Sequence, residues 1–283
     1  MSGASGADVR IAVLGHVEHI ALGRVPRLPG PGEIAHVEGL RVFPGGGGGI
    51  AFFQLVKSPA EVHLFTALGN DEAAEQVRAR IARTPARIHA AHRETPHTRD
   101  VVLITPDGER TIVVLGEPLH PEVRDPLPWE VLGSCDAAYF TAQDPGVLRA
   151  ARAAKLLVAT ARRREAIFRS GVQADVIVGS LADARERASL RDFPVPPRAL
   201  VLTQGAAGGQ IETAEGISRF PAPQVRPTPG GGAYGAGDSF AGALTWFLAL
   251  GLPVAEACAR AAHHGAAVLG SLEPLDAQLP LGP

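Results

Sequence analysis

Residues 230–240 read Gly-Gly-Gly-Ala-Tyr-Gly-Ala-Gly-Asp-Ser-Phe, and an apolar helical pattern follows at once. The helix predicted over Asp238–Leu250 places Asp238 at or near its N-cap, and Gly251 and Pro253 end it. First-turn N–H groups and the helix dipole attract anions, and the Asp238 carboxylate can accept a proton beside them. The segment therefore predicts a site for phosphoryl transfer to a hydroxyl group, which requires both parts.

Simpler or different interpretations of this segment remain open. Asp238 could serve only as a helix cap, but a cap alone does not require the glycines on both sides of Ala236. Gly230-x-Gly232-x-x-Gly235 matches a dinucleotide fingerprint, but it follows prolines instead of a strand. Gly237-x-Ser239-x-Ala241 approximates a nucleophile elbow, but little chain follows for an ordered acid and histidine.

Length and composition favour a single α/β domain over residues 1–283. The 46% hydrophobic and 20% charged residues are ordinary for a globular protein. A formal net charge of -2 gives no electrostatic basis for nucleic-acid binding. The two cysteines, Cys135 and Cys258, lie far apart and lack metal-binding spacing.

No apolar run is long enough to cross a membrane, and the first six residues lack the apolar stretch of a signal peptide. We therefore expect a cytoplasmic protein with no membrane partner. The cluster Arg162-Arg163-Arg164 is interpreted as the solvated start of a helix.

Short apolar runs alternate with longer amphipathic ones, which predicts a mostly parallel sheet with helices on both faces. The predicted strands are Arg10–Leu14, Val62–Thr66, Val101–Ile104, Thr111–Leu115, Ala137–Thr141, Leu156–Ala159, Asp175–Val178 and Ala199–Thr203. The predicted helices are Ile50–Lys57, Asp71–Ala82, Gly146–Ala154, Ala182–Ser189, Asp238–Leu250 and Val254–Leu269. Such a sheet places ligands beyond the carboxyl ends of its strands.

Two segments interrupt this alternation. Residues 17–43 carry short β-like pieces around prolines, and residues 97–116 form a predicted hairpin with its turn at Pro106-Asp107-Gly108. Both are too short for a core of their own, so we expect them to pair into a small β lid over the active face. The proline-rich run Pro221–Pro229 is interpreted as an active-site loop.

The sequence Gly235-Ala236-Gly237-Asp238-Ser239-Phe240 resembles the second signature of the ribokinase/PfkB family of carbohydrate kinases. The resemblance is collinear over nearly the whole chain. It includes Gly15 after the first strand, the lid segments at 27–33 and 107–112, Pro44–Ile50, 67–71, 178–183 and 202–208. It implies a ribokinase-like three-layer fold.

Several positions depart from the family pattern. Ile20 stands where an aspartate usually holds sugar hydroxyls, and Glu18 is the candidate substitute. Ile50 replaces the asparagine that ends the first signature. Gly232 and Ala233 replace the usual Asp-Thr pair before the anion hole. The losses fall on sugar and magnesium contacts, so a less hydroxylated or partly apolar substrate fits this chain.

The resemblance implies the following site. Asp238 acts as the base, with Gly235, Ala236 and Gly237 as the anion hole. Glu18, Gly45, Gly46, Gly47 and Ile50 border the acceptor. Ser180, Thr203, Gly205, Gly208, His264 and Gly265 border the nucleotide, and Asp183 holds Mg²⁺ through water. ATP is the implied donor, and K⁺ near the anion hole and a homodimer through the lid are further family habits.

The run His16-Val17-Glu18-His19 also has the composition of a metal site. On a strand His16 and Glu18 share a face and His19 opposes them, so the three do not converge, and we expect Glu18 to contact substrate instead. The function expected is ATP-dependent phosphorylation of a sugar, sugar acid or related small alcohol. The alternatives are a nucleoside kinase and a catalytically silent nucleotide- or ligand-binding protein with the same fold.

Overall fold

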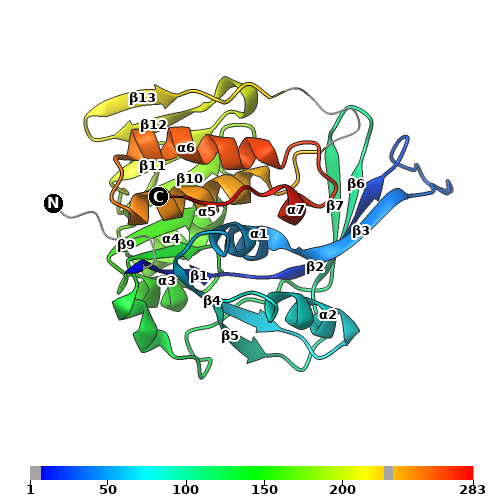
Figure 1. Ribbon diagram of the computed structural model, residues 1–283, viewed down its shortest axis with the longest axis horizontal. Helices are drawn as coiled ribbons and strands as arrows, with labels where there is room; N and C mark the ends of the chain where they lie inside the picture. Colours follow the sequence, from blue (N-terminus) through cyan, green and yellow to red (C-terminus); the bar gives the residue numbers. More distant parts are fainter. Residues whose placement is uncertain (1–7, 226–231, 283) are drawn as a thin grey trace.

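Two sheets organise the chain in the computed structural model, which describes residues 8–225 and 232–282 (Figure 1). The larger sheet has nine strands in the order β13-β12-β11-β10-β9-β8-β1-β4-β5. Its strands are β1 (Arg10–Leu14), β4 (Glu61–Leu68), β5 (Arg87–His92), β8 (Ala137–Phe140), β9 (Leu156–Thr160), β10 (Val176–Ser180), β11 (Ala199–Thr203), β12 (Gly209–Thr213) and β13 (Gly216–Phe220). All pairs from β11 to β5 are parallel, and β12 and β13 form an antiparallel edge.

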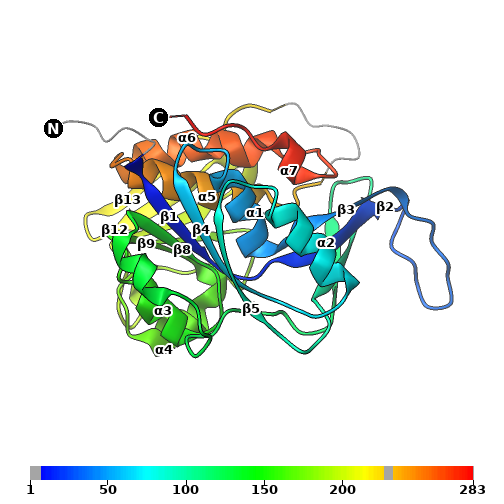
Figure 2. The ribbon, with the colours of Figure 1, turned by 60° about the horizontal axis from the view of Figure 1, so that its bottom comes forward.

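Helices cover both faces of this sheet (Figure 2). The helices are α1 (Gly46–Leu55), α2 (Glu72–Ile81), α3 (Pro145–Ala151), α4 (Arg164–Ser170), α5 (Ala236–Ala249), α6 (Val254–Ala267) and α7 (Pro274–Ala277). Strand β1 shows how the two faces divide, because side chains alternate along a strand. Ile11 and Val13 pack into the core cluster that contains residues of α1, α2, α5 and α6. Ala12 and Leu14 pack into the second cluster, with residues of α3 and α4.

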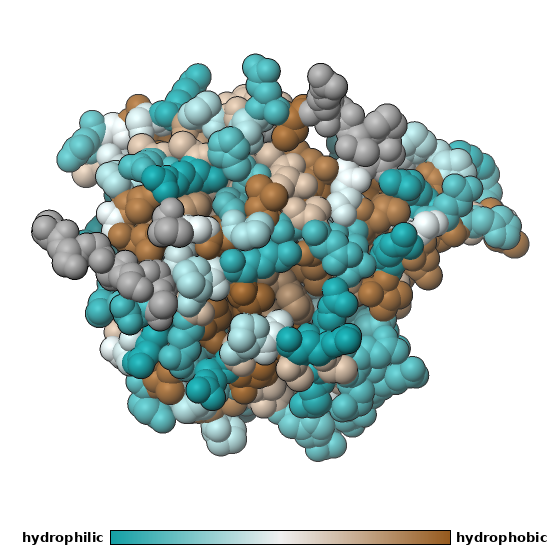
Figure 3. Space-filling view, viewed as in Figure 1, coloured by the Kyte–Doolittle hydropathy of each residue, from teal (hydrophilic) through white to brown (hydrophobic). Residues whose placement is uncertain are grey.

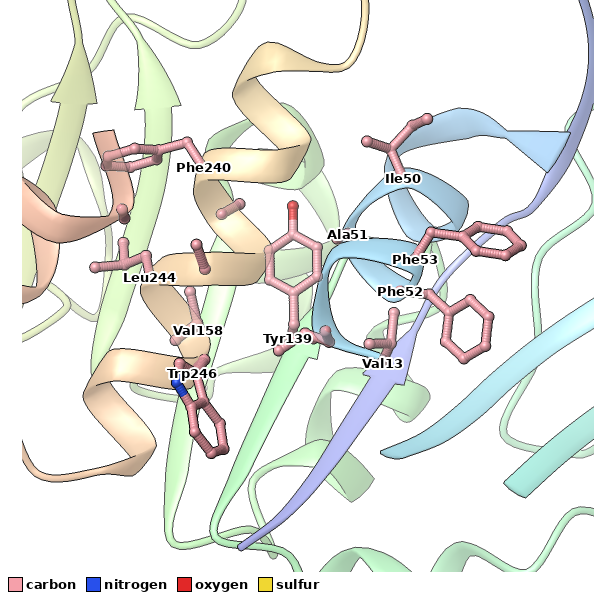
Figure 4. Close-up of a cluster of buried hydrophobic side chains, with 14 of the residues drawn as sticks. Val13, Ile50, Ala51, Phe52, Phe53, Tyr139, Val158, Phe240, Leu244 and Trp246 are labelled. Carbon is pink, nitrogen blue, oxygen red and sulfur yellow. The ribbon is translucent and has the colours of Figure 1, made fainter. Parts of the chain in front are cut away.

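Helices α1 and α5 lie side by side over the middle of the sheet, and their core residues meet around Tyr139 (Figure 4). Tyr139 extends from β8 between the two helices, and Trp246 at the far end of α5 is fully buried. This packing fixes where both helices begin, at the carboxyl ends of the strands.

The second sheet is the lid, in the order β3-β2-β6-β7. Its strands are β2 (Glu18–Arg24), β3 (Glu38–Gly45), β6 (Arg99–Ile104) and β7 (Arg110–Leu115). The prediction that residues 17–43 and 97–116 pair into one small sheet is therefore confirmed. The hairpin turn is also where it was predicted, with the Gly108 N–H donating to the Thr105 carbonyl at 2.9 Å.

The two faces of the lid differ in exposure. On the inner face Ile20, Leu22, Val102 and Ile104 are almost completely buried. Other apolar side chains remain about half exposed: Leu40 and Val42 on β3, and Ile112, Val113, Val114 and Leu115 on β7. In the space-filling view apolar atoms are visible on the lid side of the molecule (Figure 3).

One prediction about local structure is wrong, and two are confirmed only in part. Residues 182–189 form bends and turns instead of a helix. The Asp183 carboxylate accepts the Arg185 N–H at 2.9 Å, and such local side-chain bonds compete with a helix. Helix α5 begins at Ala236 with Gly235 as its N-cap, so Asp238 lies in the first turn and does not cap it. The arginine cluster does lead into α4, which begins at Arg164, and Arg162 is exposed, but Arg163 is partly buried and bonds to the Thr141 carbonyl.

Strands β5, β12 and β13 and helix α7 were not predicted, and helix α4 was predicted only as a helix start at residues 162–164. The proline-rich run 221–229 is described only to residue 225, so the rest of that prediction lies outside the described residues. Within the described parts of the chain, no helix is long and apolar enough to span a membrane.

His97, which precedes β6, gives the fold a pH dependence. Its side chain is 2% exposed, and burial lowers its pKa from 6.5 to about 4. The Gly69 N–H donates to its Nδ1 at 3.3 Å. Below pH 6.5 the unfolded chain therefore binds a proton that the folded chain rejects, so stability present above pH 6.5 is lost as pH falls toward 4.

His97→Asn keeps an acceptor for the Gly69 N–H and removes the titration. We expect the pH slope of the unfolding free energy between pH 6.5 and 4 to fall by up to about 1.4 kcal/mol per pH unit. Urea unfolding of both proteins across this range measures the slope. An identical slope in the variant would show that His97 is not held neutral.

Candidate active site

The loops that follow the parallel strands meet the first turns of α1 and α5 at one edge of the large sheet. His16 and Glu18 follow β1, Thr141 follows β8, and Arg162 and Arg163 follow β9. This edge is where parallel α/β sheets bind ligands.

Asp238 lies in the first turn of α5 and faces the first turn of α1. A Cβ added to Gly47 would lie 3.3 Å from Asp238 Oδ1. Among the described residues, no other side chain forms a hydrogen bond or ion pair with this carboxylate. Burial raises the pKa of Asp238, and Arg162, followed by Arg110 and Arg163, opposes that rise.

The N-terminus of α5 is arranged by Gly235, whose φ of 79° lies in the left-handed region that glycine favours. The Ala236 N–H donates to the Ala233 carbonyl at 3.3 Å. The N–H groups of Gly235 and Gly237 have no partner within the described ranges. Two of the three predicted anion-hole amides are thus open, and the third faces the main chain.

The N-terminus of α1 is held by side chains from two other segments. The Gly46 N–H donates to the Tyr234 hydroxyl at 3.2 Å, and the Gly47 N–H donates to His16 Nε2 at 3.2 Å. Gly46 has a φ of 75°, so its backbone also needs glycine. Gly47, one of the predicted acceptor-side residues, is also the residue of this turn that lies beside Asp238.

Gly45 and Ile50 are packed inside the protein. A Cβ on Gly45 would lie 2.4 Å from the Ile20 side chain. Ile50 is fully buried, and its Cγ2 would lie 3.3 Å from a Cβ on Gly235. The predicted contact of Ile50 with substrate gains no support from this packing.

His16 and Glu18 share a face, as their spacing predicts, with His16 Nε2 3.7 Å from Glu18 Oε1. His19 points away and bonds to Gln76 at 2.9 Å. Burial, together with the hydrogen-bonded Asp100 carboxyl, raises the pKa of Glu18, and burial raises the pKa of Asp100. Burial thus favours the neutral form of both acids, and Asp100 Oδ1 has no hydrogen-bond partner among the described residues.

Arg162 and Arg163 separate to opposite sides of β9. Arg162 bonds to Asp183 Oδ2 at 2.7 Å and to Glu186 Oε1 at 2.8 Å. Arg163 donates from Nε to the Thr141 carbonyl at 2.9 Å, and its Nη2 lies 3.3 Å from His16 Nδ1.

The predicted nucleotide-side residues lie at the ends of β10 and β11 and at α6. Ser180 and Thr203 are paired neighbours across the two strands. Gly205 and Gly208 form a closed turn, in which the Gly208 N–H donates to the Gly205 carbonyl at 3.0 Å.

The two α6 residues differ in position. A Cβ on Gly265 would lie 2.9 Å from the Ala236 carbonyl, so Gly265 borders the start of α5. His264 is buried with its ring 5.7 Å from that of Phe247, and burial lowers its pKa to about 4.

Asp183, the predicted Mg²⁺ residue, already has two guanidinium partners. Arg162 and Arg185 both contact its Oδ2, and the Arg185 hydrogen bonds hold its pKa far below the ordinary range. In the described chain no group of three or more histidine, cysteine or acidic side chains is arranged to hold a metal. The expectation that Asp183 holds Mg²⁺ through water therefore stays a prediction.

Five residues at this edge of the sheet were not predicted from the sequence to belong to the site: Asp100, His120, Arg163, Glu186 and Tyr234. The position of Asp100 could have been predicted from the sequence. It lies two residues before Val102 and four before Ile104 on one strand, so all three face the inside of the lid. No local sequence pattern predicted that Arg163 and His120 lie close together, because their contact depends on long-range packing.

The fold and the site define a ribokinase-like α/β protein. Residues 145–278 match the family model described as "pfkB family carbohydrate kinase". The resemblance predicted from the signature is thereby confirmed over this region, which is similar to the PfkB family. No match was found among curated proteins.

Solved structures with the same fold have low sequence identity to the chain. Ribokinase from Thermotoga maritima is 18% identical, with 96% of each chain covered and a TM-score of 0.76. A PfkB protein from Polaromonas is 19% identical, covering 95% of this chain and 98% of that one, with a TM-score of 0.72. Adenosine kinase from Sinorhizobium meliloti is 14% identical, covering 94% and 95%, with a TM-score of 0.73.

Tyr234→Phe tests the link between the two helix starts. It leaves the buried Gly46 N–H without its acceptor, so we expect the free energy of unfolding to fall by about 1–3 kcal/mol. Tyr139→Phe is the matched control, because the Tyr139 hydroxyl has no hydrogen-bond partner in the residues described. Denaturant unfolding measures both, and an equal loss in the two variants would argue against the Tyr234–Gly46 bond.

Proposed function

We propose that this protein transfers the γ-phosphoryl group of ATP to a hydroxyl of a small sugar or sugar-like alcohol. The observation that carries the proposal is the Asp238 carboxylate, which has no hydrogen-bond or ion-pair partner among the described residues and lies beside the open amides of Gly235 and Gly237. The cytoplasmic location expected from the sequence stays a prediction.

In the proposed step the acceptor oxygen forms a bond to the γ-phosphorus, and the bond from that phosphorus to the β–γ bridging oxygen breaks. ADP leaves with the electron pair of that bond, and Asp238 takes the proton of the acceptor hydroxyl. The N–H groups of Gly235 and Gly237 and the α5 dipole stabilise charge on the transferring group, which is the main task in phosphoryl transfer.

The nucleotide would lie over the ends of β10 and β11, against Ser180, Thr203 and the Gly205–Gly208 turn. Two structures of similar fold support this donor: Arabidopsis thaliana ribokinase is complexed with ribose and ATP, and the Cryptococcus neoformans enzyme with ADP. Mg²⁺, when bound, would neutralise phosphate charge. Asp183 and Glu186 would hold it only through water, because Arg162 already contacts an oxygen of each carboxylate.

The acceptor would lie between the lid and the ends of β1 and β8. Glu18 and Asp100 offer carboxylate oxygens to its hydroxyls, and the closed lid excludes water. The exposed apolar side chains of β3 and β7 support a homodimer through the lid. K⁺ near the anion hole has less support here, because Gly232 supplies no carboxylate.

Two alternatives have their own support. Nucleoside kinases share the fold, including those from Methanocaldococcus jannaschii and Sinorhizobium meliloti. A catalytically silent binding protein is favoured by the buried Ile50, which replaces a sugar-contacting asparagine. Turnover of ATP with sugars and nucleosides separates these, since a silent protein binds nucleotide without stimulated transfer.

Asp238→Asn removes the proposed base and keeps its shape. We expect turnover to fall by about 10²–10⁴-fold with nucleotide affinity retained. In the wild type, turnover should decline as pH falls through the raised pKa of Asp238. Steady-state kinetics and nucleotide titration measure both, with Asp8→Asn at the opposite end of β1 as control. An unchanged rate would exclude Asp238 as the base.

Gly47→Ala tests the gap between α1 and the base. The new methyl would lie 3.1 Å from Thr141 Oγ1 and 3.3 Å from Asp238 Oδ1, so both must shift. We expect turnover to fall by about 10-fold or more through misplacement of the base. The unfolding midpoint should not fall, because alanine favours helix over glycine.

Gly133→Ala is the control for this variant, since a Cβ there meets nothing within 4 Å. Full activity in Gly47→Ala would show that acceptor and base do not meet at this gap.

A further inference from the structure

Arg163 places a positive charge at the candidate site without a matching carboxylate. Other partly buried arginines are paired: Arg93 with Asp125 at 2.7 Å and Arg152 with Asp175 at 2.6 Å. Arg162, the preceding residue, contacts both Asp183 and Glu186. Within the described ranges Arg163 has no acidic group within 4.0 Å.

The hydrogen bonds of Arg163 leave its outer nitrogens poorly satisfied. His16 Nε2 accepts the Gly47 N–H, and burial keeps the pKa of His16 well below 6.5. The neutral His16 ring therefore carries its proton on Nδ1, which lies 3.3 Å from Arg163 Nη2 and cannot accept from it. The remaining contact of Nη2 is His120 Nε2 at 3.5 Å, which is long for a hydrogen bond.

His120 is a second buried polar group without full partners. Its side chain is 7% exposed, and its ring lies 4.8 Å from that of His16. Its Nδ1 has no hydrogen-bond partner. Burial and Arg163 lower its pKa to about 3, so it stays neutral and adds no repulsion toward a cation or an anion.

The strand order decides which substrate Arg163 faces. Strand β9 lies between β10, on the proposed nucleotide side, and β8 and β1, on the acceptor side. Arg162 turns toward the β10 side, where Asp183 follows the strand. Arg163 turns toward Thr141 after β8 and His16 after β1. The unmatched charge therefore belongs to the acceptor side.

A short path connects this charge to the base. Asp238 Oδ1 lies 3.3 Å from the position of a Cβ on Gly47, and His16 Cε1 lies 3.5 Å from the same point. His16 in turn contacts Arg163. Asp238 and Arg163 are also near enough that each affects the pKa of the other, so both belong to the same side of the site.

We propose that Arg163, with His120 beside it, binds an oxyanion group of the acceptor, so that the substrate is an acidic sugar derivative that carries a carboxylate or a phosphate ester. This deepens the proposed function and depends on it. A guanidinium forms its strongest hydrogen bonds with such oxyanions. Burial raises the pKa of both Glu18 and Asp100, which favours their neutral forms and lessens their repulsion of an anion.

The test compares charged and neutral acceptors in matched pairs. D-gluconate and D-glucose 6-phosphate are assayed beside D-glucose, and D-ribose 5-phosphate beside D-ribose. We expect kcat/KM for at least one acid to exceed that of its neutral counterpart by about 100-fold, as for loss of a hydrogen-bonded charge pair. The carboxylate and phosphate members identify which oxyanion is bound. Equal or better use of the neutral sugars overturns the proposal.

Arg163→Gln should raise KM about 100-fold more for the acidic acceptor than for the neutral one, since any effect through the charge of Asp238 is common to both. Arg163→Lys should recover part of the loss, and Arg149→Gln on α3 is the exposed control. A fall in kcat that is equal for both acceptors would assign Arg163 to the transferring phosphoryl group and overturn the proposal. If the glutamine variant does not fold, calorimetric titration measures the affinity of the acid for the wild type and for Arg163→Lys and so tests the same subsite.

A different result would contradict only the proposed function. In that case no acceptor of either charge stimulates phosphoryl transfer, but the acid still binds with an affinity that depends on Arg163. Absence of both transfer and acid binding overturns the further inference as well.

Discussion

The site depends on the close approach of two helix N-termini at one edge of the sheet. Helices α1 and α5 pack along their length around Tyr139, and Tyr234 bonds to the first N–H of α1. Glycine at positions 47 and 235 lets the backbones meet without intervening side chains. Two positive helix ends therefore converge, and the Asp238 carboxylate between them is the negative group that this field favours.

Burial and the nearby arginines have opposite effects on the pKa of Asp238. Burial raises the pKa of Asp238, while Arg162, Arg110 and Arg163 keep the ionised form accessible. Arg110 is on the lid hairpin, so part of this compensating charge comes from a different sheet. Since Ile104 beside it packs against Gly232, lid position and the charge state of the base are physically linked.

Much of the fold could be predicted because local sequence signals were strong. Strands β1 and β11 have the predicted bounds, and the lid follows from proline and turn residues in two separate segments. Residues 182–189 failed because bonds such as Asp183 to the Arg185 N–H outweigh helix propensity. The position of Arg163 could not be predicted, since its contacts with Thr141 and His16 depend on strand order and not on nearby residues.

The departures from the family pattern form one connected change in packing. A side chain at Gly232 would meet Ile104 Cδ1 at 2.4 Å, so an aspartate there conflicts with the apolar inner face of this lid. Ile20, at the other lost acidic position, packs against Gly45. Acidic groups are instead supplied by Glu18, two residues before Ile20, and by Asp100 of β6, which pairs with Ile20, and a cation is supplied by Arg163. The usual hydroxyl-binding positions have thus become apolar packing, while the polar contacts have moved toward His16. Such a rearrangement retains Asp238 and the open amides of α5 and, under the proposed function, changes the chemistry that the acceptor must offer.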